Sequence, residues 1–124
     1  MDKKYFTDFE TSKLLSELPY DGEAYNYYYS EDGKWMKLKG TPPFEYYTEK
    51  EVYAVFLQDA REWLWNKYRI FLEVKHHAGG DFICTMYENE VHLSQTAYSS
   101  ISLAEAGGIK FAVEYVHRYK KNKS

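Results

Sequence analysis

Two small groups of side chains in this sequence are of the kinds that bind metal ions or act in catalysis. The first is His76, His77 and Asp81 around a glycine-rich turn, since imidazole and carboxylate groups are common metal ligands. Adjacent residues of a strand point to opposite faces, so one site would take only one of the two histidines directly. We therefore expect a polar turn, in which Gly79 and Gly80 supply positive φ angles, with no metal and no cofactor.

The second group is a thiol, an imidazole and a carboxylate. In the expected strand pairing Cys84, His92 and Glu73 share one face of a sheet, and these are the parts of a cysteine nucleophile site. Cys84 would lie in mid-strand, however, away from the exposed elbow or helix N-terminus that lowers a thiol pKa. The sequence also lacks nucleotide-binding and hydrolase signatures such as G-x-G-x-x-G and G-x-S-x-G. We expect a protein that is not an enzyme.

Tyrosines form the most informative cluster, since many of the 14 in the chain fall near its N-terminal end. Tyrosine is a rigid, amphipathic contact residue that is enriched at protein interfaces. Two interpretations stay open: rings that cap a sheet, or an exposed binding surface. Nearby carboxylates such as Glu31 and Asp32 disfavour a phosphate ligand. The predicted partner-binding residues are Tyr25, Tyr27, Tyr28, Tyr29, Trp35, Tyr46 and Tyr47.

Composition limits the class of protein. The 124 residues carry a formal net charge of −3, so direct nucleic-acid binding is not expected. A single cysteine excludes a disulfide framework and favours a reducing compartment. No run of 18 apolar residues or export signal is present, so we predict a cytoplasmic protein without a membrane span. The length fits one domain over residues 1–124, with a frayed basic tail at 119–124.

Helix and turn signals place these groups on elements. A short helix is expected over 8–18, capped by Thr7, and Asp32-Gly33 predicts a hairpin over 25–38. Capping boxes at Thr48 and Ser102 open two long helices, over about 48–66 and 102–120. Gly107 and Gly108 inside the last helix indicate either a close approach to a neighbouring element or a loose first turn.

Between the two long helices, residues 69–95 alternate as an antiparallel meander. We expect an α+β fold: a sheet of three to five strands, formed by this meander and the 25–38 hairpin, with the two helices packed on one face. We centre the first turn between Ala78 and Gly79 and the second on Asn89. The face toward the helices is then expected to hold Ile70, Leu72, Val74, Ile83, Thr85, Tyr87, Val91 and Leu93. The other face is half apolar, so the N-terminal elements or a second subunit should cover it.

The order of these elements resembles a known family. The stretches 60–64, 69–74 and 102–115 are similar to the phage alpha-beta-alpha sandwich domain of tailed phages and prophages, over roughly residues 44–120. The family offers no catalytic motif to carry over. The resemblance implies an accessory protein that acts on host machinery by binding.

We therefore expect a phage or prophage protein, located in the cytoplasm of a bacterial host, that occludes a host defence or nucleic-acid enzyme through a tyrosine-rich, acidic surface. An alternative is a sponge that sequesters a small nucleotide signal, probably in a pocket between subunits of a homo-oligomer. The pocket of that alternative would use Arg69, His76, His77 and Arg118. An assembly subunit is a further alternative.

Overall fold

The computed structural model describes residues 2–22, 27–37 and 51–120, and it confirms the α+β class. The described residues form three α-helices, one short 3-10 helix at Lys3–Tyr5 and two three-stranded antiparallel sheets. The helices are α1 (Phe9–Glu17), α2 (Leu57–Tyr68) and α3 (Ile101–Tyr119). The strands are β1 (Tyr27–Tyr29), β2 (Trp35–Lys37), β3 (Val52–Tyr53), β4 (Ile70–His76), β5 (Phe82–Glu88) and β6 (Val91–Tyr98).

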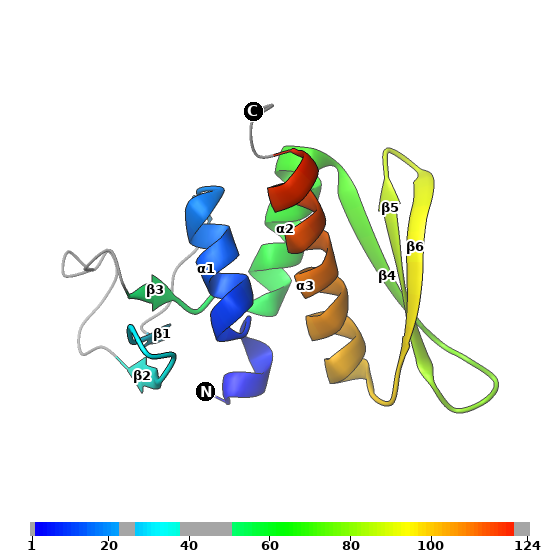
Figure 1. Ribbon diagram of the computed structural model, residues 1–124. Coiled ribbons are helices and arrows are strands. Elements are labelled where there is room, and N and C mark those ends of the chain that lie inside the picture. Colours follow the sequence, from blue (N-terminus) through cyan, green and yellow to red (C-terminus); the bar gives the residue numbers. More distant parts are fainter. Residues whose placement is uncertain (1, 23–26, 38–50, 121–124) are drawn as a thin grey trace.

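The elements are stacked in layers (Figure 1). The larger sheet has the order β4-β5-β6, and α2 and α3 lie on one side of it, as predicted. On the far side of these helices α1 contacts both α3 and β3. The predicted hairpin forms as β1 and β2, but it pairs with β3 in a small sheet of its own, in the order β2-β1-β3, and does not extend the meander.

The start of α2 differs most from the sequence prediction. The helix begins at Leu57 rather than Thr48, after an N-cap Phe56 that makes no side-chain capping bond. Val52 and Tyr53 instead form β3, which suits a β-branched and an aromatic residue, and Val52 is buried in the small sheet's core. Residues 48–50 of the predicted capping box lie outside the described residues.

The other two helices begin close to the predicted positions. The N-cap of α1 is Asp8 rather than Thr7, since its carboxylate accepts from the Thr11 backbone N–H at 2.8 Å. Ser100 caps α3 two residues before the predicted Ser102, through a 3.2 Å bond from the Leu103 N–H. In the predicted basic tail α3 continues to Tyr119, and residues 121–124 lie outside the described residues.

The strand register of the meander is shifted by one residue from the prediction. Pairing of His76 with Phe82 centres the first turn on Gly79, rather than between Ala78 and Gly79. The second turn is the pair Asn89-Glu90, both at positive φ, and the pairing of β5 with β6 has a bulge between Met86 and Tyr87. A shift of one residue moves side chains to the other face of a sheet. The buried face therefore contains Cys84 and Met86 in place of Ile83, Thr85 and Tyr87, and Val91 and Leu93 of β6, also predicted to be buried, are exposed.

Two apolar clusters hold the described residues together. The larger lies between the helices and the β4-β5-β6 sheet and includes Leu15, Leu64, Ile70, Ile109 and Val113. The smaller lies against the β2-β1-β3 sheet and consists of Phe6, Tyr29, Val52 and Ala54. The segment from Phe6 to α1 contributes to both clusters, so it connects the small sheet to the helices.

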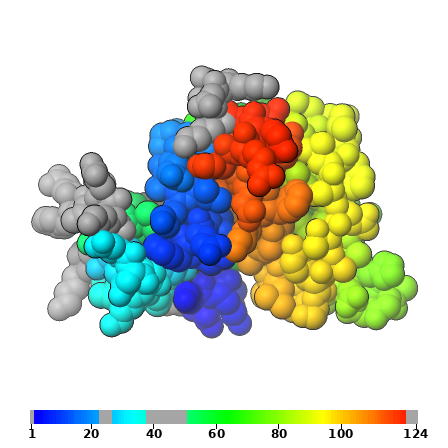
Figure 2. Space-filling model, in the orientation of Figure 1, coloured from blue at the N-terminus to red at the C-terminus, as the bar shows by residue number. Residues whose placement is uncertain are grey.

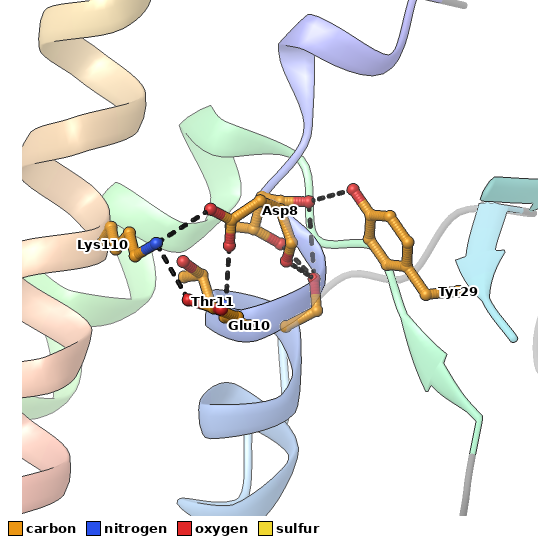
Figure 3. Close-up of polar contacts among 7 residues, drawn as sticks. Asp8, Glu10, Thr11, Tyr29 and Lys110 are labelled. Atoms are coloured by element: carbon orange, nitrogen blue, oxygen red, sulfur yellow. Dashed lines mark hydrogen bonds and ion pairs between the residues drawn. The ribbon is translucent and has the colours of Figure 1, made fainter. Parts of the chain in front are cut away.

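A polar network lies at this connection (Figure 3). The Tyr29 hydroxyl donates to the Thr7 carbonyl oxygen at 2.7 Å, and the Ser12 hydroxyl donates to the Asp8 carbonyl oxygen at 2.7 Å. The Lys110 ammonium of α3 lies 3.4 Å from the Asp8 carboxylate and 3.1 Å from that of Glu10. Burial and the nearby Asp8 charge raise the pKa of Tyr29 to about 12, so this hydroxyl stays protonated and able to donate.

Removing the Asp8 charge should give a pH-dependent loss of stability. Burial raises the pKa of this carboxyl group, but the hydrogen bonds from Thr11 and the charge of Lys110 together lower it by more. The net pKa therefore lies below its ordinary value. The carboxylate therefore stabilises the fold above about pH 4, and this contribution is lost as the pH falls through the lowered pKa. We expect Asp8→Asn, which keeps a capping oxygen, to lower the free energy of unfolding by about 0.5 kcal/mol at neutral pH.

Urea unfolding at neutral pH and at about pH 2 measures this difference between Asp8→Asn and the wild type, which should become smaller at the acid end. Glu10→Gln is the matched control, because Glu10 contacts the same Lys110 without capping the helix, and its effect should be smaller. A deficit of equal size at both pH values would contradict the assignment.

Candidate functional site

The predicted group of Cys84, His92 and Glu73 is not assembled. Cys84 faces the helices and is buried, whereas Glu73 and His92 lie on the opposite face of the sheet. Burial raises the pKa of the Cys84 thiol, and the Arg61 charge lowers it by less. The prediction that the three side chains share a face was wrong, because it depended on a strand pairing that is shifted by one residue at the Gly79 turn.

The tyrosine cluster is divided between core and surface. Tyr29, predicted to contact a partner, is only 1% exposed and is a core residue of the small sheet. Tyr27 and Trp35 stack on each other at 4.9 Å between ring centroids and pack half-buried against Phe6. Tyr28 points to the other side of β1, where it is also half-buried. The remaining predicted contact residues, Tyr25, Tyr46 and Tyr47, lie outside the described residues.

The four predicted nucleotide-binding residues lie in three places. Arg69 follows α2 at one end of β4, and its guanidinium lies 5.0 Å from the centre of the Trp65 ring. His76 and His77 lie at the other end of β4, about 20 Å away, on a hairpin that projects beyond the helices (Figures 1 and 2). Arg118 lines a groove between α1 and α3. One copy of the chain therefore does not bring them together.

The face of the β4-β5-β6 sheet that points away from the helices is the larger candidate surface. We call it the open face, because the described N-terminal elements, which were expected to cover it, lie beyond the helices on the opposite side of the sheet (Figure 1). Its side chains follow from the strand register. They are Phe71, Glu73, Lys75, Ile83, Thr85, Tyr87, His92, Gln95 and Ala97.

An aromatic row crosses this face from α2 to β6. Trp65 meets Phe71 edge-on, with 6.5 Å between ring centroids, and Phe71 lies 6.5 Å from Tyr87. Tyr87 in turn lies 5.8 Å from the His92 ring on the neighbouring strand. Trp65 is 42% exposed and Phe71 is 49% exposed, which is unusual for side chains of this size. The row is therefore a continuous run of four rings, in which Trp65, Phe71 and His92 are exposed and Tyr87 is half-buried.

The row borders a hollow of about 710 Å³ between α2 and the edge strand β4, which we call the notch. Its lining includes Trp65, Phe71 and Tyr87, and also Arg61, whose guanidinium donates to the Leu72 carbonyl oxygen at 2.6 Å. Arg61 also forms an ion pair of 2.9 Å with Glu105 of α3. The arginine therefore blocks part of the free edge of β4, and its own charge is neutralised.

Three carboxylates stand around the notch. Glu62 of α2 and Glu90 of the β5–β6 turn are exposed, and neither forms an ion pair with any of the described residues. Glu73 is half-buried and lies 3.5 Å from the exposed Lys75 ammonium. With Arg61 neutralised by Glu105, the lining has an excess of negative charge, and a phosphate would be repelled there.

The sequence interpretation did not include Trp65, although a signal for it exists. Trp65 falls outside the apolar stripe of α2 and shares the polar side of the helix with Gln58, Arg61 and Glu62. An aromatic residue on the polar side of an amphipathic helix is a candidate contact residue. Its neighbours Phe71 and Tyr87 could be placed beside it only once the strand register was known.

Comparisons with protein-family models, with curated proteins and with solved structures found no match for this chain. Within residues 2–22, 27–37 and 51–120, the helices are too short or too polar to cross a membrane. The same described residues contain no group of three or more histidine, cysteine or acidic side chains placed to hold a metal ion.

Proposed function

We propose that this chain is a binding protein, not an enzyme, and that it occludes a site on a partner protein by docking its open face there. The observation that carries the proposal is the aromatic row of Trp65, Phe71, Tyr87 and His92, in which every ring but the half-buried Tyr87 is exposed. Tryptophan and tyrosine contribute large contact area with few rotatable bonds, and they dominate the binding energy of many interfaces.

This proposal keeps the predicted mode of action and moves the contact surface. The tyrosines of the small sheet offer less free ring surface, since Tyr29 is buried and Tyr27 is stacked on Trp35. The open face instead combines exposed rings with polar neighbours such as Lys75 and Gln95, the usual make-up of an interface core and rim. A bacterial host protein as partner, the cytoplasm as compartment and the phage origin remain part of the proposal.

A photo-crosslinking experiment tests this surface. We expect p-benzoylphenylalanine in place of Phe71, in tagged protein expressed in a bacterial host, to give one adduct of defined mass with another protein. The matched control carries the same group in place of Phe111, a phenylalanine on α3 with nearly the same exposure, 46% against 49%. Adducts of equal yield from both positions, or only a dimer of the chain itself, would contradict the proposal.

With the captured partner in hand, Phe71→Ala should weaken binding about tenfold, as expected for a central aromatic contact, and Phe111→Ala should leave it unchanged. Both side chains are about half exposed, so both variants should stay folded, which thermal unfolding checks.

A further inference from the structure

We infer that the notch between α2 and β4 receives a cationic side chain, an arginine or a lysine, from a basic segment of the partner protein. This inference rests on the proposed function and adds the chemistry of the partner. It is carried by the two kinds of group that meet in the notch: the rings of Trp65 and Phe71, and the carboxylates of Glu62 and Glu90.

The rings supply the first half of the recognition. A cation over the face of an aromatic ring is attracted by the electrons of that face, and tryptophan is the strongest of these acceptors. The fold already uses this interaction beside the notch, where the Arg69 guanidinium lies 5.0 Å from the Trp65 ring centre. A planar guanidinium also stacks on Phe71 or Tyr87 without losing its hydrogen bonds in the ring plane.

The carboxylates supply the second half. Glu62 and Glu90 form no ion pair with the described residues, so both can accept hydrogen bonds from an incoming guanidinium or ammonium. The nearest opposing charge in the lining, Arg61, is already paired with Glu105 and with the Leu72 carbonyl oxygen. An uncharged apolar group would leave these carboxylates without a partner, and an anion would be repelled by them.

Short labelled peptides test the charge directly. The probe is a fluorescein-labelled nonapeptide of glycine and serine with three arginines, compared with peptides that carry three citrullines or three glutamates at the same positions. Citrulline has nearly the shape of arginine but no charge. In low salt we expect fluorescence anisotropy to show binding of the arginine peptide, with the citrulline peptide at least about fivefold weaker and the glutamate peptide inactive.

Variants locate the binding. Glu62→Gln combined with Glu90→Gln should weaken the arginine peptide about fivefold. The matched control, Glu10→Gln combined with Glu114→Gln, removes the same charge from the groove between α1 and α3 and should change little. In ¹⁵N–¹H spectra the Trp65 indole signal should shift on titration. Equal binding of the citrulline peptide, an equal loss in the control pair, or no binding of the arginine peptide would overturn the inference.

This outcome is separable from that of the proposed function. If Phe71→Ala weakens binding of the captured partner while the Glu62 and Glu90 variants leave binding unchanged, the open face is the contact surface and the inference of a cationic side chain in the notch is wrong. If Phe71→Ala has no effect either, both proposals fail.

Discussion

Replacing Gly108 with alanine is expected to lower the free energy of unfolding by about 2 kcal/mol. A Cβ atom on Gly108 would meet the Cys84 sulfur and would lie 3.3 Å from the Cys84 Cβ atom. Both residues are buried, where α3 crosses the β4-β5-β6 sheet, so neither can move away cheaply. The close approach predicted from the two glycines is thereby confirmed. The cost of the added contact with Cys84 outweighs the gain in helix propensity of about 1 kcal/mol that alanine brings.

Gly107→Ala is the matched control, because it brings the same gain in helix propensity. Its Cβ atom would meet the outer end of the Tyr98 ring, which is half-buried at the end of β6 and can turn away. We therefore expect a change within about 0.5 kcal/mol at this position. Equal losses at both glycines in urea unfolding would contradict the packing argument.

A double variant identifies the sulfur as the obstacle. Cys84→Ala in the Gly108→Ala background should recover part of the loss, so that the two changes are not additive. Recovery is incomplete because the Cβ atom of residue 84 remains at 3.3 Å. Alkylation by iodoacetamide gives a second measurement. Cys84 is buried, and burial raises its pKa, so it should be inert in the native protein and should react faster in Gly108→Ala.

The sequence predicted those parts of the fold that local signals determine. The hairpin follows from Asp32-Gly33, and Gly33 indeed adopts a positive φ of 84°. The meander and α3 follow from alternation, helical spacing and capping. The start of α2 did not follow, because Thr48-x-x-Glu51 satisfies the capping pattern, while the pairing of Val52 and Tyr53 with β1 is a long-range contact that no local signal reports.

The candidate site was harder to predict, because it depends on register. The second turn, Asn89-Glu90, has two residues at positive φ without a glycine, so its length was not evident. Tyr87 was expected on the buried face because the first turn was placed one residue out of register, and the second turn and the bulge after Met86 then decide which β6 side chain lies beside it. The aromatic row requires Phe71 and Tyr87 on the same face, so it could not be assembled from the sequence.

Contacts between residues distant in sequence also explain why the tyrosine-rich hairpin was predicted to be the binding surface. Alternation along β1 places Tyr27 and Tyr29 on one side of the strand and Tyr28 on the other. Which side is buried is set by Phe6 and Val52, which are distant in sequence. The core of the small sheet therefore takes up the rings that the sequence offered as contacts.

Leu15→Ala is expected to lower the free energy of unfolding by about 3 kcal/mol. Leu15 of α1 is fully buried in the larger cluster, where it packs with Leu18 and Val55. Truncation removes three carbon atoms and leaves a cavity that the surrounding helices can fill only in part. Leu14→Ala is the control, since Leu14 is half-buried at the edge of the same cluster and should cost about 1 kcal/mol.

This variant also tests whether the chain is one domain, because α1 is the element that joins the small sheet to α3. If the chain unfolds as one unit, hydrogen exchange in Leu15→Ala should accelerate by a similar factor for slowly exchanging amides of α1, β1 and β5. If β5 keeps its protection while α1 and β1 lose theirs, the small sheet and α1 form a separate unfolding unit. In that case the β4-β5-β6 sheet with α2 and α3 would suffice for the aromatic row, because all four of its rings lie on α2 and on those three strands.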